Sequence, residues 1–275
     1  MKLFIRKIKE NIVPICQLLL LVIILFLPSW INVKDKLITP LELKVSQNLL
    51  DYILFFAWEN GNIAIGLVLT IVNLFVMRKM NKEHIYNKGN EYKNYPYWWY
   101  WICSKILGYM KCNLKYVPIY MQFKLVLRDT FEEYECGEYS RKEDDKITVQ
   151  KINFGQNSDE INIMIADTYE LSESQLPLLK TGNPTIIIAR DNKNDYNRYD
   201  SPELIKTVVN VVRGLSKKFL TVNVFATTNP LNTKKIVQEA FKLGGRDIIK
   251  KIVVFQQSNN GIRKFGAKGV QVYKR

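Results

Sequence analysis

Two uninterrupted apolar stretches near the start dominate the hydrophobic pattern of the chain. They are Ile12–Trp30 and about Ile63–Met77, and neither contains a charged residue. A hydrocarbon core about 30 Å thick takes about 20 apolar residues in a helix. The pattern therefore predicts two transmembrane helices, at about 12–31 and 62–80, within a membrane domain of residues 1–80.

The alternative for the first stretch is a cleaved signal peptide, because Lys2 and Arg6 give it a positively charged leader. A cleavage site needs a small-x-small pattern after the apolar run. Pro28, Ser29 and Trp30 stand there instead, and a second apolar stretch follows. The sequence favours a retained anchor.

Basic residues flank the two stretches on their outer ends, with four before the first and Arg78, Lys79 and Lys82 after the second. Positive flanks face the cytoplasm. We therefore expect a multi-pass protein of the cell inner membrane with both termini cytoplasmic. Residues 40–58, between the stretches, fit either an amphipathic helix on the outer surface or a lengthened second span.

Residues 81–146 have the composition of a juxtamembrane connector. Tyr95–Trp101 contains six aromatic residues in seven, which is typical of an interfacial belt, although such a group also packs in soluble cores. Val117–Leu127 has a strand-like composition. Asp129–Asp145 is acidic and polar, and we interpret it as a solvated loop and a domain boundary.

Residues 147–275 alternate short apolar runs with amphipathic segments. Ser201 and Pro202 open one predicted helix, and Asn232 or Thr233 caps a second. Continuous apolar strands separated by helices favour a parallel sheet covered on both faces. The expected fold is a membrane-anchored α/β protein with a cytoplasmic, Rossmann-like, open and mainly parallel sheet. The predicted strands are 160–166, 185–189, 220–226, 252–255 and 269–273.

Polar side chains follow three of these strands directly. Ligands of open parallel sheets bind beyond the carboxyl ends of the strands, and helix N-termini attract anions. Lysines in the first turn of a helix oppose its dipole, so a bound phosphate would explain them; a plain turn with an N-cap is the alternative. The predicted ligand-binding residues are Asp167, Thr168, Arg190, Asp191, Thr227, Thr228, Asn229, Lys234 and Lys235.

The net charge of +14 is concentrated at the end of the chain. Residues 204–275 contain fifteen lysines and arginines but only Glu239 and Asp247 as acids. Such a distribution indicates an anionic partner, which can be a nucleotide, a nucleic acid or the lipid surface.

Other chemistry finds little support in the sequence. The four cysteines form no CxxC pair and His84 is the one histidine, which disfavours a zinc site or a histidine-dependent hydrolase. No P-loop or dinucleotide fingerprint occurs. Asp167 and Asp191 could hold a metal for phosphodiester cleavage. We predict no catalytic residue, no metal and no cofactor, with a membrane-anchored nuclease or nucleotide hydrolase as the alternative.

The order of the parts resembles the two-span membrane effectors of bacterial anti-phage defence. These occur in cyclic-oligonucleotide systems (CBASS, and type III CRISPR with CARF or SAVED sensors) and in retrons. The stretch Leu220–Leu231, in the region with the sequence VNVFATTNPLNT from Val222 on, is similar in style to the strand and turn of CARF and SAVED domains.

The resemblance implies a non-enzymatic effector that stays silent until a trigger reaches its cytoplasmic domain. The trigger would be a cyclic oligonucleotide or a reverse-transcriptase–nucleic-acid complex. The protein would then form a homo-oligomer, disrupt the membrane lipid and cause abortive infection. A passive membrane scaffold is the alternative from another class.

Overall fold

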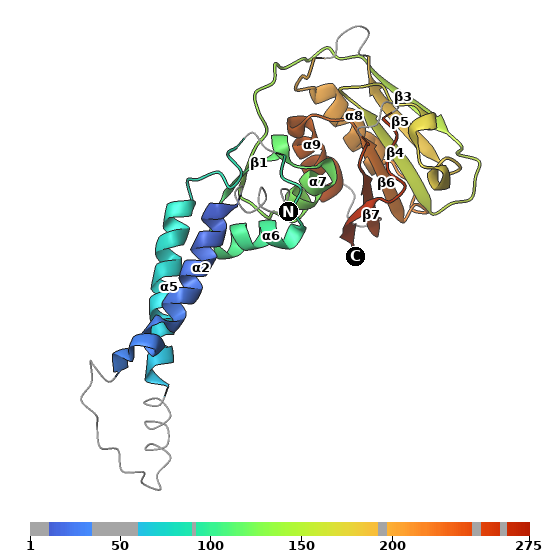
Figure 1. Ribbon diagram of the computed structural model, residues 1–275. Helices are drawn as coiled ribbons and strands as arrows, with labels where there is room; N and C mark the ends of the chain where they lie inside the picture. The colour runs from blue at the N-terminus through green and yellow to red at the C-terminus, as the bar shows by residue number, and fades with distance from the viewer. Residues whose placement is uncertain (1–10, 35–59, 90–91, 192–196, 244–248, 259–262) are drawn as a thin grey trace. The chain divides into compact units, whose positions relative to one another are not determined.

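The structure is a computed structural model that describes most of the chain, and it divides into two compact units (Figure 1). The first unit contains Met1–His84 and Trp101–Met110, and the second contains Ile85–Tyr100 and Lys111–Arg275. The chain therefore passes between the units three times. The described residues are 11–34, 60–89, 92–191, 197–243, 249–258 and 263–275.

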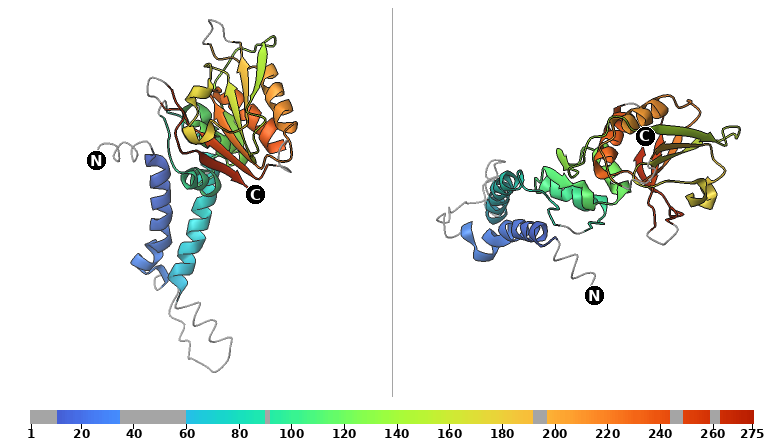
Figure 2. Two further views of the ribbon diagram at one scale, coloured as in Figure 1. Left: turned by 90° about the vertical axis from the view of Figure 1, so that its right-hand side faces the viewer. Right: turned by 90° about the horizontal axis from the view of Figure 1, so that it is seen from above.

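Two long apolar helices make up most of the first unit. Helix α2 (Ile12–Ile31) and helix α5 (Gly61–Asn81) agree with the predicted spans to within a residue. Both are long and apolar enough to cross a membrane. They lie side by side in both views of Figure 2. The predictions for residues 40–58 fall outside the described residues.

The two helices approach most closely at Gly66. A Cβ atom at this position would lie 2.1 Å from the backbone oxygen of Leu25. Because small residues allow such backbone approach in membrane helix pairs, Gly66 sets the spacing of α2 and α5. The hydroxyl of Thr70, one turn later, donates to the Gly66 carbonyl at 2.8 Å.

A short π-helix, η1 (Ile102–Ile106), packs beside the last turn of α5 within this unit. The Arg78 guanidinium donates to the carbonyls of Lys105 and Ile106. Asn81 donates from Nδ2 to the Leu107 carbonyl at 2.7 Å. These bonds satisfy carbonyls at the end of η1 that have no partner within a helix.

Replacing Gly66 with leucine is expected to separate α2 from α5, because the new side chain occupies the space of the Leu25 carbonyl. Overpacking of this kind costs about 1–3 kcal/mol. Spin labels on the lipid-facing sides of α2 and α5 should report a longer distance in reconstituted protein. Gly61→Ala is the matched control, since its Cβ meets only the flexible Lys34 side chain at 3.4 Å. An unchanged distance in Gly66→Leu would contradict the prediction.

The second unit is built on a six-stranded mixed sheet in the order β3-β5-β4-β6-β7-β8. The four central strands are parallel, whereas β3 and β8 pair antiparallel at the two edges. The predicted parallel arrangement holds at the centre only, and the Rossmann-like description stays a prediction. The strands are β3 (Ile147–Ile152), β4 (Glu160–Ala166), β5 (Thr185–Arg190), β6 (Thr221–Ala226), β7 (Lys251–Phe255) and β8 (Val270–Lys274).

The longer helices of this unit lie on one side of the sheet (Figure 1). Helix α8 (Pro202–Arg213) packs against β5 and β3, and its Ser201 cap accepts from the Leu204 amide as predicted. Helix α9 (Pro230–Ile236) continues into the π-helix η5 (Val237–Leu243). Its cap is Asn229, three residues before the earlier of the two predicted caps.

The strand-like interpretation of Val117–Leu127 is wrong. This segment forms helix α7 (Ile119–Leu127), which packs against α9, η5, β7 and β8. Six of its nine residues are buried, and Phe123 contacts Phe241 with the ring centroids 5.8 Å apart. Tertiary packing on two sides thus overrides the β-propensity of its composition.

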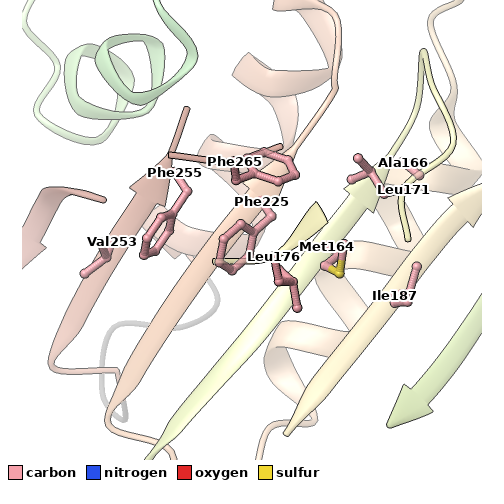
Figure 3. Close-up of a cluster of buried hydrophobic side chains, with 9 residues drawn as sticks. All are labelled: Met164, Ala166, Leu171, Leu176, Ile187, Phe225, Val253, Phe255 and Phe265. Carbon is pink, nitrogen blue, oxygen red and sulfur yellow. The ribbon is translucent and has the colours of Figure 1, made fainter. Parts of the chain in front are cut away.

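Short connections cover the opposite face of the sheet. There, Phe225 and Phe255 stack at 4.5 Å between centroids, and Phe265 meets Phe225 edge-on at 5.1 Å. Leu171 and Leu176, from the β4–β5 connection, close the cluster over Met164, Ala166, Ile187 and Val253 (Figure 3). This connection contains the single turns η3 (Glu173–Gln175) and η4 (Leu178–Lys180).

The predicted connector contributes to both units. Tyr100 is buried with its hydroxyl bonded to the Lys93 carbonyl, whereas Trp98 is 58% exposed. The acidic segment contains a buried tyrosine, Tyr134, in a two-stranded parallel sheet. The remaining elements are α6 (Tyr97–Trp101), β1 (Lys111–Asn113), η2 (Leu114–Tyr116) and β2 (Glu133–Glu135).

Candidate functional site

The order of the central strands creates a switch point at the carboxyl end of β4. The chain leaves β4 for β5 on one side, and then crosses back through α8 to β6 on the other side. The connections from β4 to β5 and from β6 to β7 run in opposite directions across the sheet. Because such crossovers are right-handed, they lie on opposite faces, and the chain segments that follow β4 and β6 move apart. Thr168 and Thr227 face each other there, with the Thr168 amide 3.3 Å from the Thr227 carbonyl.

A polar pocket of about 210 Å³ opens at this point. Four of the predicted residues line it: Thr168, Thr227, Thr228 and Asn229. Two basic side chains, Lys115 and Arg198, and three glutamines supply further polar groups. The glutamines and the remaining lining residues are Gln122, Gln256, Gln257, Tyr92, Val117, Ile119, Tyr169, Ala226 and Pro230.

Asp167 lies beneath the pocket and orders its wall. The carboxylate Oδ2 accepts from the backbone amide of Asn229 at 3.1 Å and from its Nδ2 at 3.2 Å. It also accepts from Asn232 Nδ2 at 2.9 Å. Because Asn229 caps α9, this one carboxylate fixes both the turn after β6 and the start of the helix.

Arg190 completes this buried group. Its Nε lies 3.3 Å from Asp167 Oδ1, and its Nε and Nη2 both donate to the Asp167 carbonyl. The Asp145 carboxylate, also buried, lies 3.8 Å away on the other side of the guanidinium. Asp167 is 0% and Arg190 3% exposed, and neither lines the polar pocket.

Burial raises the pKa of Asp167 above its ordinary value, because a charged carboxylate loses hydration there. The hydrogen bonds from Asn232 and Asn229 and the charge of Arg190 act in the opposite direction but do not offset the burial. A carboxyl group buried in this way is unfavourable without partners, so its pairing with Arg190 and the two asparagines is a condition for the local fold.

The other predicted residues lie away from the pocket. Lys235 forms an ion pair with Asp200 at 2.7 Å, which explains a lysine at the start of α9 without a phosphate. The ammonium of Lys234 donates to the Tyr134 carbonyl at 3.4 Å. Asp191 is exposed and lines a different depression of about 330 Å³ together with Arg190.

Several lining residues were missed by sequence reasoning. Gln256 and Gln257 directly follow β7, so the strand-end rule applied to the other strands would have found them. Lys115 and Gln122 come from the segment before the sheet, and nothing local marks them. Gln122 is held by two bonds from its Nε2, to the carbonyls of Leu114 and Val117.

We expect Asp167→Asn to destabilise the second unit by about 1–3 kcal/mol, because an amide group at this position brings hydrogen-bond donors among the donors of Asn229, Asn232 and Arg190. A carboxyl whose folded pKa is raised contributes stability at low pH and loses it as the pH rises through the folded pKa. The difference in the free energy of unfolding between wild type and Asp167→Asn should therefore be largest near pH 4 and decrease toward neutral pH.

Urea unfolding of the full chain in detergent, followed at several pH values, measures this gap. The exposed carboxylate at Asp191 gives the matched control, and Asp191→Asn should change stability by less than about 0.5 kcal/mol. A gap between wild type and Asp167→Asn that widens with increasing pH would contradict the assignment.

Two helices that are long and apolar enough to cross a membrane are followed in this chain by an α/β unit with a polar pocket at its strand ends. The chain belongs to the SMODS- and Ubiquitin system-associated 2TM effector domain family (SUa-2TM), whose model matches residues 1–272. This membership confirms the resemblance to two-span effectors of anti-phage defence.

The chain also shows a distant similarity to solved structures. One is a SAVED/CARF-domain containing receptor, Cap4 of Acinetobacter baumannii, with the cyclic trinucleotide 3'3'3'-cAAA: 10% identity, TM-score 0.43, 62% of this chain and 40% of that chain. The same receptor with 2'3'3'-cAAA gives 8% identity, TM-score 0.45 and the same coverage. The chain thus spans well under half the length of this receptor. No curated protein shows significant similarity to the chain.

Proposed function

We propose that this protein is an inner-membrane effector of anti-phage defence that is triggered by a cyclic oligonucleotide. The nucleotide binds the strand-end pocket, the protein self-associates, and the membrane becomes permeable. The observation that carries the proposal is the pocket at the switch point, in which hydroxyls, amides and two basic side chains converge without a catalytic group. Family membership supports the effector role.

The chemistry of the lining suits a nucleotide. Lys115 and Arg198 supply positive charge for phosphate. Side-chain amides pair with the edges of bases, adenine in particular. Gln122 supports this assignment, because its Oε1 is buried beside the pocket and has no hydrogen-bond partner among the described residues. A ligand amino group would satisfy it.

The size of the pocket favours a small ligand that is only partly enclosed. Its volume of about 210 Å³ lies below the roughly 300–1,000 Å³ of sites that enclose a drug-sized molecule. One nucleotide of a cyclic oligonucleotide would occupy it, and the rest would remain available to a second copy of the chain. A reverse-transcriptase–nucleic-acid complex would need a far larger surface.

An enzymatic role receives less support from the geometry. Asp167 is enclosed by Arg190 and two asparagines, whereas Asp191 lines another depression. Among the described residues, no group of three or more histidine, cysteine, aspartate or glutamate side chains could hold a metal ion. We therefore propose binding without catalysis.

Replacing Lys115 and Arg198 with glutamine should weaken nucleotide binding about tenfold or more for each change, because each removes a charge-assisted contact to phosphate. Titration of the full chain with a panel of cyclic di- and trinucleotides measures the affinity. Lys206→Gln is the matched control, since Lys206 lies on α8, outside the pocket, with its side chain 69% exposed. Equal affinities for all variants, or no binding from the panel, would overturn the proposal.

Self-association finds support in two complementary surfaces of the second unit. Leu178 and Leu179 on η4 are 91% and 85% exposed. The β4–β5 connection that carries these leucines covers the face of the sheet on which Ile187 lies. The preceding residue of β5, Ile186, points to the opposite face. There it lines an apolar cleft of about 740 Å³ together with Val211 and Leu215. A protrusion and a cleft on opposite faces of one chain fit a head-to-tail contact between copies.

The double variant Leu178→Ser/Leu179→Ser should lose ligand-induced oligomers, with an association constant lower by about tenfold or more. Val211→Asp, within the cleft, should do the same. An equimolar mixture of the two variants should form dimers and nothing longer, because one intact leucine pair and one intact cleft remain. Analytical ultracentrifugation in detergent with saturating nucleotide measures this, and long oligomers of either variant alone would contradict the contact.

The membrane step rests on the first unit. Arg78 and Lys79 lie in the last turn of α5, which supports a cytoplasmic position for this end and for both termini. The exposed apolar side chains of α2 and α5 support contact with lipid. We propose that self-association of the cytoplasmic units brings several pairs of spans together in the inner membrane.

A further inference from the structure

Amide side chains lie at three levels along the paired helices α2 and α5. At one end Gln17 and Asn81 exchange two hydrogen bonds of 2.9 and 3.1 Å. At the other end Asn62 donates to Asn32 at 2.8 Å. Asn73 lies between these two pairs. Both of these pairs are hydrogen-bonded and lie toward the ends of the helices, so Asn73 is the amide that needs an explanation.

Asn73 is deep within the predicted span. It comes twelve residues after the start of α5 and eight before its end. At 1.5 Å per residue these separations are about 18 Å and 12 Å. A hydrocarbon core is about 30 Å thick, so the amide lies well inside it. No water is available at this depth, and polar groups there need partners from the protein.

The side chain faces an apolar level of the helix pair. Leu25 contacts Gly66, and Gln17 contacts Asn81, so the midpoint of these two contacts places Asn73 level with Leu21. Leu21 is buried at 9% exposure. The Nδ2 atom of Asn73 is buried and has no hydrogen-bond partner among the described residues. A polar group in this state destabilises the paired arrangement.

A passive anchor would have leucine at this position. Polar residues inside membranes are costly, face the interior of a bundle or a water-filled cavity, and mark pathways for ions and substrates. The same face of α5 carries Gly66 and Thr70, about two turns and one turn before Asn73. The other residues between Gly66 and Asn73 are apolar and exposed: Leu67, Val68, Leu69, Ile71 and Val72.

We propose that the observed helix pair is a closed state, and that Asn73 lines a water-filled path for small hydrated ions when spans from several copies reorganise. Separation from α2 exposes one stripe of α5 with the Asn73 amide, the Thr70 hydroxyl and the bare backbone at Gly66. Water then satisfies the amide that the closed state leaves without a partner, so opening recovers the free energy that pairing costs. This inference rests on the proposed function, because it needs a trigger and several copies.

Leakage from vesicles tests the proposal. The full chain is reconstituted in phosphatidylethanolamine–phosphatidylglycerol vesicles loaded with a self-quenched dye, and the panel of cyclic di- and trinucleotides is added. Wild-type protein should release the dye. Asn73→Leu should lower the release rate by about tenfold, since an apolar lining dewets the path. Nucleotide affinity should stay within about twofold of wild type, because position 73 lies outside the nucleotide-binding unit.

Two further variants make the result specific. Asn73→Ser keeps a polar group at this level and should retain release. Val72→Leu makes a similar apolar change one residue away, on the lipid-facing side at 55% exposure, and should also retain release. Flotation of the vesicles shows that each variant is inserted.

The outcomes separate this inference from the proposed function. If Asn73→Leu releases dye as fast as wild type, the role of Asn73 is wrong and the proposed function stands. If Val72→Leu loses release as well, the effect is not specific to the polar stripe, and the inference also falls. If wild-type protein binds a nucleotide but never releases dye, the permeabilisation step fails together with the inference.

Discussion

The buried carboxylate of Asp167 holds the segments at the strand-end edge of the second unit in place. Asp167 is bonded to Arg190 on one side and to Asn229 and Asn232 on the other. Taking these groups out of water is unfavourable unless all of them are paired, so the loss of one partner would leave the others exposed to the same penalty. The pocket wall at Thr168 and Thr227 therefore depends on Asp167 and Arg190, which do not line the pocket themselves.

The first unit uses amides under a different constraint. Two amide pairs join α2 and α5 toward their ends and hold the helices in register. Gln17 bonds to Asn81 in one pair, and Asn62 bonds to Asn32 in the other. In the middle, the close contact at Gly66 provides the packing. The helices are thus joined by amide pairs toward both ends and by one close backbone contact, whereas the Nδ2 atom of Asn73 is buried without a hydrogen-bond partner among the described residues.

The sequence predicts the framework well because its signals are local. Uninterrupted apolar runs identify both long helices and the central strands, and Ser201 marks its helix start. The edge strand β3 has mostly exposed residues, so it lacks an apolar run, and the mixed character of the sheet was not foreseen. Val117–Leu127 was misread because its composition suits a strand, whereas α9 and η5, more than 100 residues later, bury it as a helix.

The candidate site shows the same division. Residues directly after strands were found from position alone, as with Thr168, Thr227 and Asn229. Lys115 and Gln122 were missed because only the fold brings them to the switch point. Lys235 was assigned to a phosphate because its partner Asp200 is 35 residues away in sequence. The partner of a charged side chain can lie far away in the sequence, so it is identified only from the folded structure.

The three passages of the chain between the two units have a mechanical consequence. The backbone leaves the first unit after His84, returns at Trp101 and leaves again after Met110. A single covalent connection would leave the two units free to rotate relative to each other, whereas three connections restrict that rotation. Transferring the second unit to another membrane domain would accordingly require three simultaneous junctions, which a simple gene fusion does not provide.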